Sequence, residues 1–206
     1  MNAEMVRDMV LSSSGLLKPI IGGPSVKPYQ PPGLWELATS GRGLLATYKQ
    51  DHGDKLYRRG MYTFIKRTVP PPSMMIFDAS NRDQCEVKRS RTNTPLQALV
   101  MMNDPTVLEA SVALADLIIQ KRQSPEAAVN ETFMRIINRH PDPQEQTVLL
   151  DYLNNQKTIF TSNPAIVEKV IRVGEYQLVS TPSPELAALA RMIQVIYNMD
   201  EAITKT

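Results

Sequence analysis

The feature that most constrains this chain is a polar capping residue placed directly before a proline, which occurs six times after residue 92. The side-chain oxygen of such a residue accepts a hydrogen bond from the first turn of a helix, and proline fits the first helical position because its missing N–H would have had no partner there. The pattern predicts six helix starts and favours a helical bundle with short connections. The pairs are Thr94-Pro95, Asp104-Pro105, Ser124-Pro125, Asp142-Pro143, Asn163-Pro164 and Ser183-Pro184.

Apolar side chains recur at helical spacing behind these starts, which predicts one buried face on each helix. Thr94 with Gln97 and Asp142 with Glu145 also have the spacing of a capping box, with Asp replacing Ser or Thr in the second. The segment 95–102 is apolar nearly all round, so we expect a short, buried, central helix there. The three stripes are Val129, Phe133, Ile136 and Ile137; Leu149, Tyr152, Leu153, Gln156, Ile159 and Phe160; and Leu186, Leu189, Ala190, Ile193 and Tyr197.

Before residue 92 the chain is rich in proline and glycine, so regular elements must be short. We expect a helix over 3–13 that ends at Gly15, followed by a long irregular stretch. A helix over 54–67 is predicted next, because its apolar and basic residues separate onto two faces; a strand over 61–68 is the alternative. The fold class is therefore mainly α, with a helical bundle in the C-terminal half and a long irregular Pro/Gly-rich N-terminal arm.

The net charge of +2 conceals an uneven distribution along the chain. Residues 55–91 carry nine basic and three acidic side chains, whereas residues 92–206 carry nine basic and thirteen acidic ones. We expect a single domain over 1–206, made of an irregular arm with one N-terminal helix (1–53), a basic segment (54–91) and the bundle (92–206).

The basic segment is the candidate ligand site. Its basic clusters lead directly into the helix start at Thr94-Pro95, whose free N–H groups also favour anions. One interpretation is a site for sulfate, phosphate or an acidic glycan; the other is that the arginines pair with the acidic helices after residue 92 or face another domain. The candidate ligand-binding residues are Arg58, Arg59, Arg67, Arg91 and Asn93.

No catalytic or cofactor motif is present, so the catalytic residues stay unknown. The polar run at 51–54 is interpreted as a loop that caps the following helix, and no metal site is expected. If the domain were an enzyme, Asp51, His52 or Asp78 would be the acid/base candidates. The single cysteine, Cys85, excludes an internal disulfide, a thiolate zinc cluster and a haem-attachment motif. No nucleic-acid motif and no apolar run long enough to span a membrane is present.

Several long strings of the sequence together resemble one family. They are Gly22–Pro28, Tyr57–Arg59, Lys66–Met74, Phe77–Ala79, Arg89–Leu99, Asn103–Pro105 and Asp200–Lys205. They resemble the C-terminal domain of unknown function 1553 of planctomycete-type, cytochrome-c-associated exported multidomain proteins, which are also abundant in Bacteroidetes. The chain departs from the family pattern at Gly60, where a larger residue is common, and at Ile65, where tryptophan is common.

The resemblance implies a larger parent protein with an export signal, other domains upstream and this region last. It implies an extracytoplasmic location through a signal that the fragment lacks, haem only in an upstream domain, and no cofactor here. We therefore expect a structural or interaction domain that contacts upstream domains of its parent, with a link to polysaccharide utilisation. The alternative is a domain that binds or hydrolyses an anionic ligand, such as an acidic glycan, through its arginines. No enzymatic activity is expected of the isolated domain.

Overall fold

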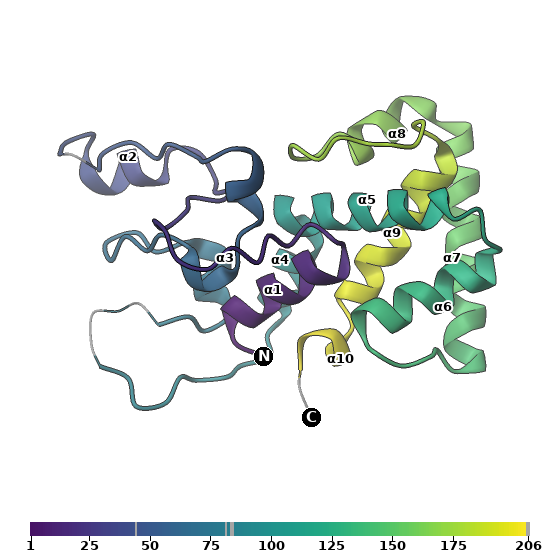
Figure 1. The fold of residues 1–206 in the computed structure, drawn as a ribbon, viewed down its shortest axis with the longest axis horizontal. Helices are drawn as coiled ribbons and strands as arrows, with labels where there is room; N and C mark the ends of the chain where they lie inside the picture. The colour runs from purple at the N-terminus through teal and green to yellow at the C-terminus, as the bar shows by residue number, and fades with distance from the viewer. Residues whose placement is uncertain (44, 81, 83–84, 205–206) are drawn as a thin grey trace. The chain divides into compact units, whose positions relative to one another are not determined.

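The computed structural model describes residues 1–43, 45–80, 82 and 85–204, and the regular elements of this part are all helical (Figure 1). The mainly α fold class is therefore confirmed. The elements are α1 (Ala3–Ser13), α2 (Leu34–Thr39), the 3₁₀ turns η1 (Gly53–Tyr57) and η2 (Gly60–Tyr62), α3 (Pro72–Ile76), α4 (Pro95–Asn103), α5 (Pro105–Gln120), α6 (Pro125–Ile136), α7 (Pro143–Ser162), α8 (Pro164–Ile171), α9 (Pro184–Tyr197) and α10 (Asp200–Ile203).

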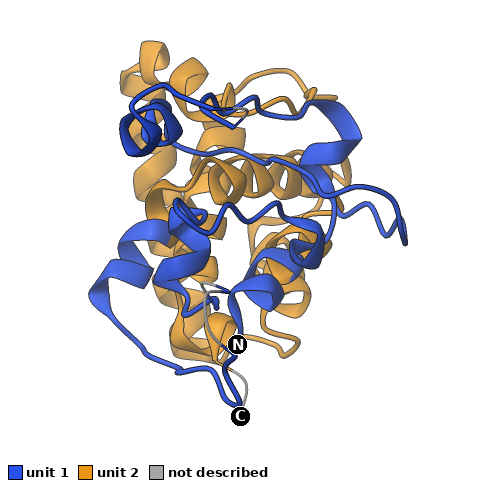
Figure 2. Ribbon diagram, turned by 90° about the vertical axis from the view of Figure 1, so that its left-hand side faces the viewer, with its two compact units in different colours: residues 1–8, 17–100 blue, residues 9–16, 101–206 orange. Residues whose placement is uncertain are grey.

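The chain divides into two compact units (Figure 2). Unit 1 comprises residues 1–8 and 17–100, and unit 2 comprises residues 9–16 and 101–206. Two helices, α1 and α4, contribute residues to both units. The sequence changes in composition near residue 92, whereas the structural division follows Val100.

All six helices that the pairs of capping residue and proline predicted form at those positions, and most of their caps are present. The Oδ1 atom of Asp142 accepts a hydrogen bond from the N–H of Glu145 at 2.7 Å, and the Glu145 carboxylate accepts one from the N–H of Asp142 at 2.8 Å. Thr94 and Gln97 make the same reciprocal pair, at 3.2 and 3.4 Å. Both predicted capping boxes are thus confirmed, because local hydrogen bonding alone decides them. Asn163 precedes α8 without a side-chain cap.

Unit 2 is built around α9, against which α5, α7, α8 and α6 pack. The whole predicted α9 stripe, from Leu186 to Tyr197, is at most 3% exposed. The Tyr197 hydroxyl lies 2.7 Å from the Ser13 hydroxyl, which ties the end of α1 into this unit. On α7 the stripe is confirmed for Leu149, Leu153 and Phe160 but is wrong for Ile159, which is 45% exposed.

Unit 1 corrects the prediction of one helix over 54–67. The backbone forms η1 and η2 instead, and Arg58 and Arg59 between them are extended, with ψ of 156° and 147°. Only isolated bridges join this region to other backbone, such as Val26 with Thr63, so the alternative strand is not formed either in the described residues. The arm, which was predicted to be irregular here, also contains α2; the high glycine content on both sides of this short helix had argued against it.

The expected burial of α4 is wrong. Gln97 and Met101 are 2% and 1% exposed, but Leu96 and Leu99 are 51% and 55% exposed. Helical spacing places these two leucines on one face. This apolar helix therefore presents one face to solvent, which its composition alone did not predict.

Candidate functional site

Arg58, the first candidate residue, is a structural arginine with 5% exposure. Its guanidinium donates hydrogen bonds to the carbonyl oxygens of Pro24 at 2.8 Å and Ile20 at 3.1 Å, and also to that of Gly22. The same group lies 3.8 Å from the centre of the Tyr62 ring. This arginine holds the 20–24 loop in place through its two terminal nitrogens, while its Nε is buried without a hydrogen-bond partner in the described residues.

Arg59 is held by an acidic residue of α1. Its Nε atom donates to Asp8 Oδ2 at 2.8 Å, while the other Asp8 oxygen accepts from the N–H of Gly60 at 2.6 Å. This hydrogen bond and the charge of Asp8 raise the pKa of Arg59 above its usual value. Gly60 lies so close to Glu4 that a β-carbon would come within 2.8 Å of Glu4 Cα. A larger residue at this position therefore requires a different approach of α1.

The remaining candidates, Arg67, Arg91 and Asn93, are exposed. Arg91 lines a hollow with a volume of about 390 Å³. We call it the basic hollow; it is lined by Asn2, Glu86, Val87, Lys88, Arg89 and Arg91. Arg89 is anchored there by Glu4, because its Nη1 atom donates to both carboxylate oxygens, at 2.8 and 2.9 Å. The sequence places Lys88 and Arg89 in the same basic cluster as Arg91, but of the three only Arg91 was among the candidate ligand-binding residues.

Two of the three acid/base candidates, Asp51 and Asp78, join separate segments of the chain. Asp51 accepts from the N–H of Lys27 at 2.8 Å, and Asp78 accepts from both the N–H and the hydroxyl of Thr92 at 2.7 and 2.9 Å. Gln97 then donates to Ile76 O at 2.9 Å. These contacts fix the entry into α4. Within the described residues, no group of three His, Cys, Asp or Glu side chains is arranged to hold a metal ion.

Two buried carboxylates on α5 were not predicted at all. Glu109 and Asp116 are both 0% exposed and lie seven residues apart on one face of the helix. Each accepts hydrogen bonds from the irregular segment 172–183, which we call the strap. The sequence could have indicated them, because these two acidic residues lie within a helix that is otherwise almost entirely apolar.

Asp116 has the larger share of these contacts. It accepts from the N–H groups of Val179 at 2.8 Å and Ser180 at 2.9 Å and from the Tyr176 hydroxyl at 2.8 Å. Burial opposes ionisation of Asp116, but the hydrogen bonds outweigh it and lower its pKa. Glu109 accepts from the N–H groups of Glu175 and Tyr176 at 2.6 and 2.7 Å. Because both carboxylates accept from backbone N–H groups, they hold the strap mainly through its main chain.

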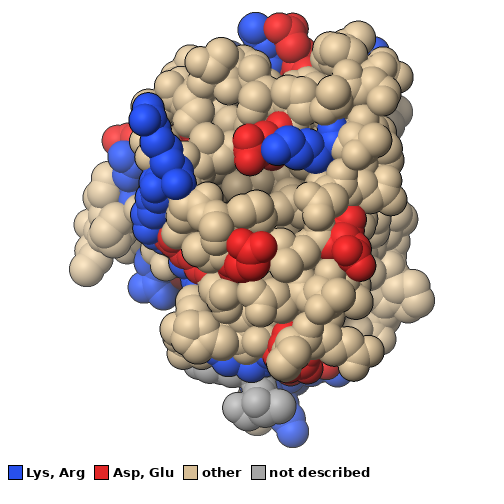
Figure 3. Space-filling model, turned by 90° about the vertical axis from the view of Figure 1, so that its right-hand side faces the viewer, with Lys and Arg blue, Asp and Glu red and all other residues tan. Residues whose placement is uncertain are grey.

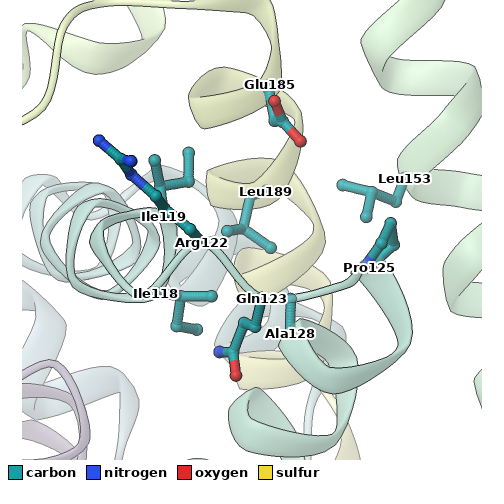
Figure 4. Close-up of a pocket in the computed structure, with 9 residues that line it drawn as sticks. All are labelled: Ile118, Ile119, Arg122, Gln123, Pro125, Ala128, Leu153, Glu185 and Leu189. Atoms are coloured by element: carbon teal, nitrogen blue, oxygen red, sulfur yellow. The ribbon is translucent and has the colours of Figure 1, made fainter.

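A second hollow, of about 300 Å³, lies in unit 2 (Figure 4). We call it the α5–α9 crevice; it is lined by Ile118, Ile119, Arg122, Gln123, Pro125, Ala128, Leu153, Glu185 and Leu189. Its apolar side chains come from four helices, and Figure 4 shows Glu185 above them and the guanidinium of Arg122 extending outward from them.

A charged cluster supports one side of the crevice. Gln123 donates to Glu131 at 2.8 Å, and Glu131 also accepts from Lys121 at 2.6 Å and Arg135 at 2.9 Å. Burial works against ionisation of Glu131, yet these three donors lower its pKa to about 2. Figure 3 views the molecule from the side on which α6 and α7 lie, and shows acidic and basic side chains scattered over a mostly uncharged face. The acidic excess after residue 92 does not gather into a single patch on this face.

Comparison with known proteins identifies the family. The family model described as PSD1, protein of unknown function (DUF1553), matches residues 1–153. The chain belongs to the DUF1553 family. The DUF1553 match covers unit 1 and continues through α5, α6 and the first half of α7. No curated protein and no solved structure matches the chain.

The DUF1553 assignment confirms the family that the sequence strings suggested. Its exported, cytochrome-associated setting stays a prediction. Among the helices of the described chain, none combines the length and the apolar character that crossing a membrane requires.

Proposed function

We propose that this DUF1553 chain is an interaction domain that contacts upstream domains of a larger exported protein. The single observation that carries the proposal is the exposed apolar face of α4, where Leu96 and Leu99 each leave about half of their surface in solvent. Contiguous apolar patches on a surface are typical of sites that another protein covers, and neighbouring exposed leucines on one helix face form the start of such a patch. We call Leu96, Leu99 and the preceding basic string 88–91 the α4 surface.

The charge of the α4 surface supports a protein partner. Helix α4 carries no charged residue, while Lys88, Arg89 and Arg91 precede it by a few residues. Interfaces commonly combine an apolar centre with a charged rim, and arginine is enriched in them. The partner surface that fits is apolar with acidic residues at its edge. An extracytoplasmic location and a role in polysaccharide utilisation are part of the proposal, supported by the resemblance of the sequence strings.

Photo-crosslinking in the intact parent protein tests this proposal. A photoreactive residue at Leu99 is expected to crosslink to a peptide upstream of this domain. The matched control places the same residue at Val148, which is 59% exposed on α7. If the Leu99 probe yields no more upstream crosslinks than the Val148 probe, the α4 surface is not the interface.

The basic hollow favours a second candidate function, the binding of an anionic glycan. Lys88 and Arg91 line it with Arg89, although Glu86 and Glu4 reduce the local positive charge. Titration with a sulfated oligosaccharide tests this candidate. The double variant Lys88→Gln/Arg91→Gln is expected to weaken binding by about tenfold or more, and Arg67→Gln to leave it unchanged. Equal binding of a neutral oligosaccharide contradicts it.

A further inference from the structure

The α5–α9 crevice has an apolar interior that the fold leaves open. Ile118, Leu153 and Leu189 are 1%, 8% and 3% exposed, so nearly all of each side chain is already packed within the unit. Between them a space of about 300 Å³ remains. This volume lies at the small end of the range for ligand pockets, about 300–1,000 Å³. It therefore fits a small ligand with an aliphatic group.

Two opposite charges stand at the edge of this crevice. The side chain of Arg122 has no hydrogen-bond or ion-pair partner within the part of the chain that the structure describes. Glu185 has one weak partner, Lys157 at 3.6 Å, and both members of that pair are more than half exposed. Exposed pairs of this kind contribute little to stability, so the Glu185 carboxylate stays available to a ligand.

The conformation of Arg122 provides a further argument. It follows α5 with φ of 50°, in the left-handed region where glycine is the usual residue after a helix. Its N–H donates to Ile119 O at 2.9 Å, which is the hydrogen bond of such a helix end. An arginine is costly at this position, and glycine would end the helix better. The fold by itself gives no reason for an arginine here.

We propose that the α5–α9 crevice binds a small zwitterion with an aliphatic side chain, either a free amino acid such as leucine or a short apolar peptide. The ligand carboxylate pairs with Arg122, its ammonium group pairs with Glu185, and its side chain enters the apolar interior. A ligand with only a carboxylate would gain from Arg122 but would be repelled by Glu185. The charge pair therefore selects zwitterions over simple acids or amines.

Calorimetric titration of the purified chain with L-leucine and with L-leucyl-L-leucine tests the proposal and distinguishes the two sources. At least one of them is expected to bind, with glycine, isovalerate and isoamylamine each weaker by about tenfold or more, because each lacks one of the three matched groups. Amide NMR signals of Gln123, Ala128 and Leu189 are expected to shift on binding. Absence of both heat and shifts with the two zwitterions overturns the proposal, as does equal binding of glycine.

Variants separate recognition from folding. Arg122→Gly is expected to raise the melting temperature, because it relieves the left-handed backbone, and to weaken binding by about tenfold or more. Glu185→Gln is expected to weaken zwitterion binding while it improves binding of isovalerate. Arg172→Gln, which changes an exposed arginine paired with Glu168 on α8, is the matched control and is expected to keep full affinity. Full affinity in Arg122→Gly would contradict the assigned role of Arg122.

Discussion

Gly174 in the strap packs directly on the buried carboxylate of Glu109, and the space between them leaves no room for a β-carbon. The backbone of Gly174 is left-handed, with φ of 79°. The next two N–H groups, of Glu175 and Tyr176, donate to the same Glu109 oxygen. The glycine thus lets the backbone come close enough to α5 for a buried carboxylate to hold it.

Substituting Gly174 tests this close approach. Gly174→Ala is expected to destabilise the chain by about 2–4 kcal/mol, because it adds a clash with Glu109 to the backbone strain. Gly15→Ala is the matched control, since Gly15 belongs to the same unit, has the same φ of 79° and has its nearest neighbour, Leu117 Cδ1, at an ordinary 3.7 Å. Urea unfolding measures both. Equal losses in the two variants would show that strain alone matters at Gly174.

Asp116 is expected to make stability depend on pH. Its pKa is lowered in the folded state, so its contribution is fully present above the unfolded value of about 3.9 and is lost as pH falls through the lower folded value. Asp116→Asn is expected to cost about 2–4 kcal/mol at neutral pH, because an amide presents a donor to groups that are themselves donors.

Unfolding curves recorded between neutral pH and strong acid measure this effect. The difference in stability between the native chain and Asp116→Asn is expected to shrink below the unfolded pKa. Asp151→Asn, at an exposed position of α7, serves as the control and is expected to leave the curve unchanged. A stability difference between the native chain and Asp116→Asn that does not change with pH would contradict the stabilising role of the ionised Asp116.

Arg58 is expected to stabilise the 20–24 loop specifically. Arg58→Lys keeps the charge but loses the fork of donors, so it is expected to cost about 2–3 kcal/mol. Hydrogen exchange provides a local measurement, because the Gly22 N–H donates to the Tyr62 hydroxyl at 2.8 Å and is expected to exchange faster in the variant. Arg67→Lys changes an exposed arginine and is expected to leave exchange at Gly22 unaltered.

The two faces of α4 are expected to respond differently to substitution. Leu99→Ser is expected to change the free energy of unfolding by less than about 0.5 kcal/mol, since this side chain is 55% exposed. Met101→Ala is expected to cost about 2–4 kcal/mol, because Met101 is 1% exposed. Thermal or urea unfolding distinguishes the two. A large loss in Leu99→Ser would mean that this face is covered in the free chain.

Local chemistry made the helical half predictable from sequence. A cap such as Asp142 and a proline such as Pro143 act within one turn, so the start of α7 follows from a few neighbouring residues. The α9 stripe was predictable for a similar reason, since a helical period of apolar residues needs only some neighbour to cover it. The family match over residues 1–153 agrees with the strings that suggested it.

The candidate site depended on contacts between distant parts of the chain. The predicted basic face over 54–67 required a helix, but the backbone is extended at Arg58. The Arg58 side chain donates hydrogen bonds to carbonyl oxygens more than thirty residues earlier in the chain. Nothing in the local sequence specifies those carbonyl groups as its partners. Arg59 likewise forms its ion pair with Asp8, fifty-one residues away, and not with the acidic helices after residue 92.

The sequence by itself determined that the chain is helical, where six of its helices begin and which face of α9 is buried, because hydrogen bonds within a turn and periodicity along a helix are local. Tertiary structure alone decided that Leu96 and Leu99 stay exposed, that Glu109 and Asp116 hold the strap, and that Arg122 stands at the edge of an apolar crevice. The burial of a side chain and the identity of its hydrogen-bond or ion-pair partners depend on which distant segments come into contact. The spacing of neighbouring residues does not specify either.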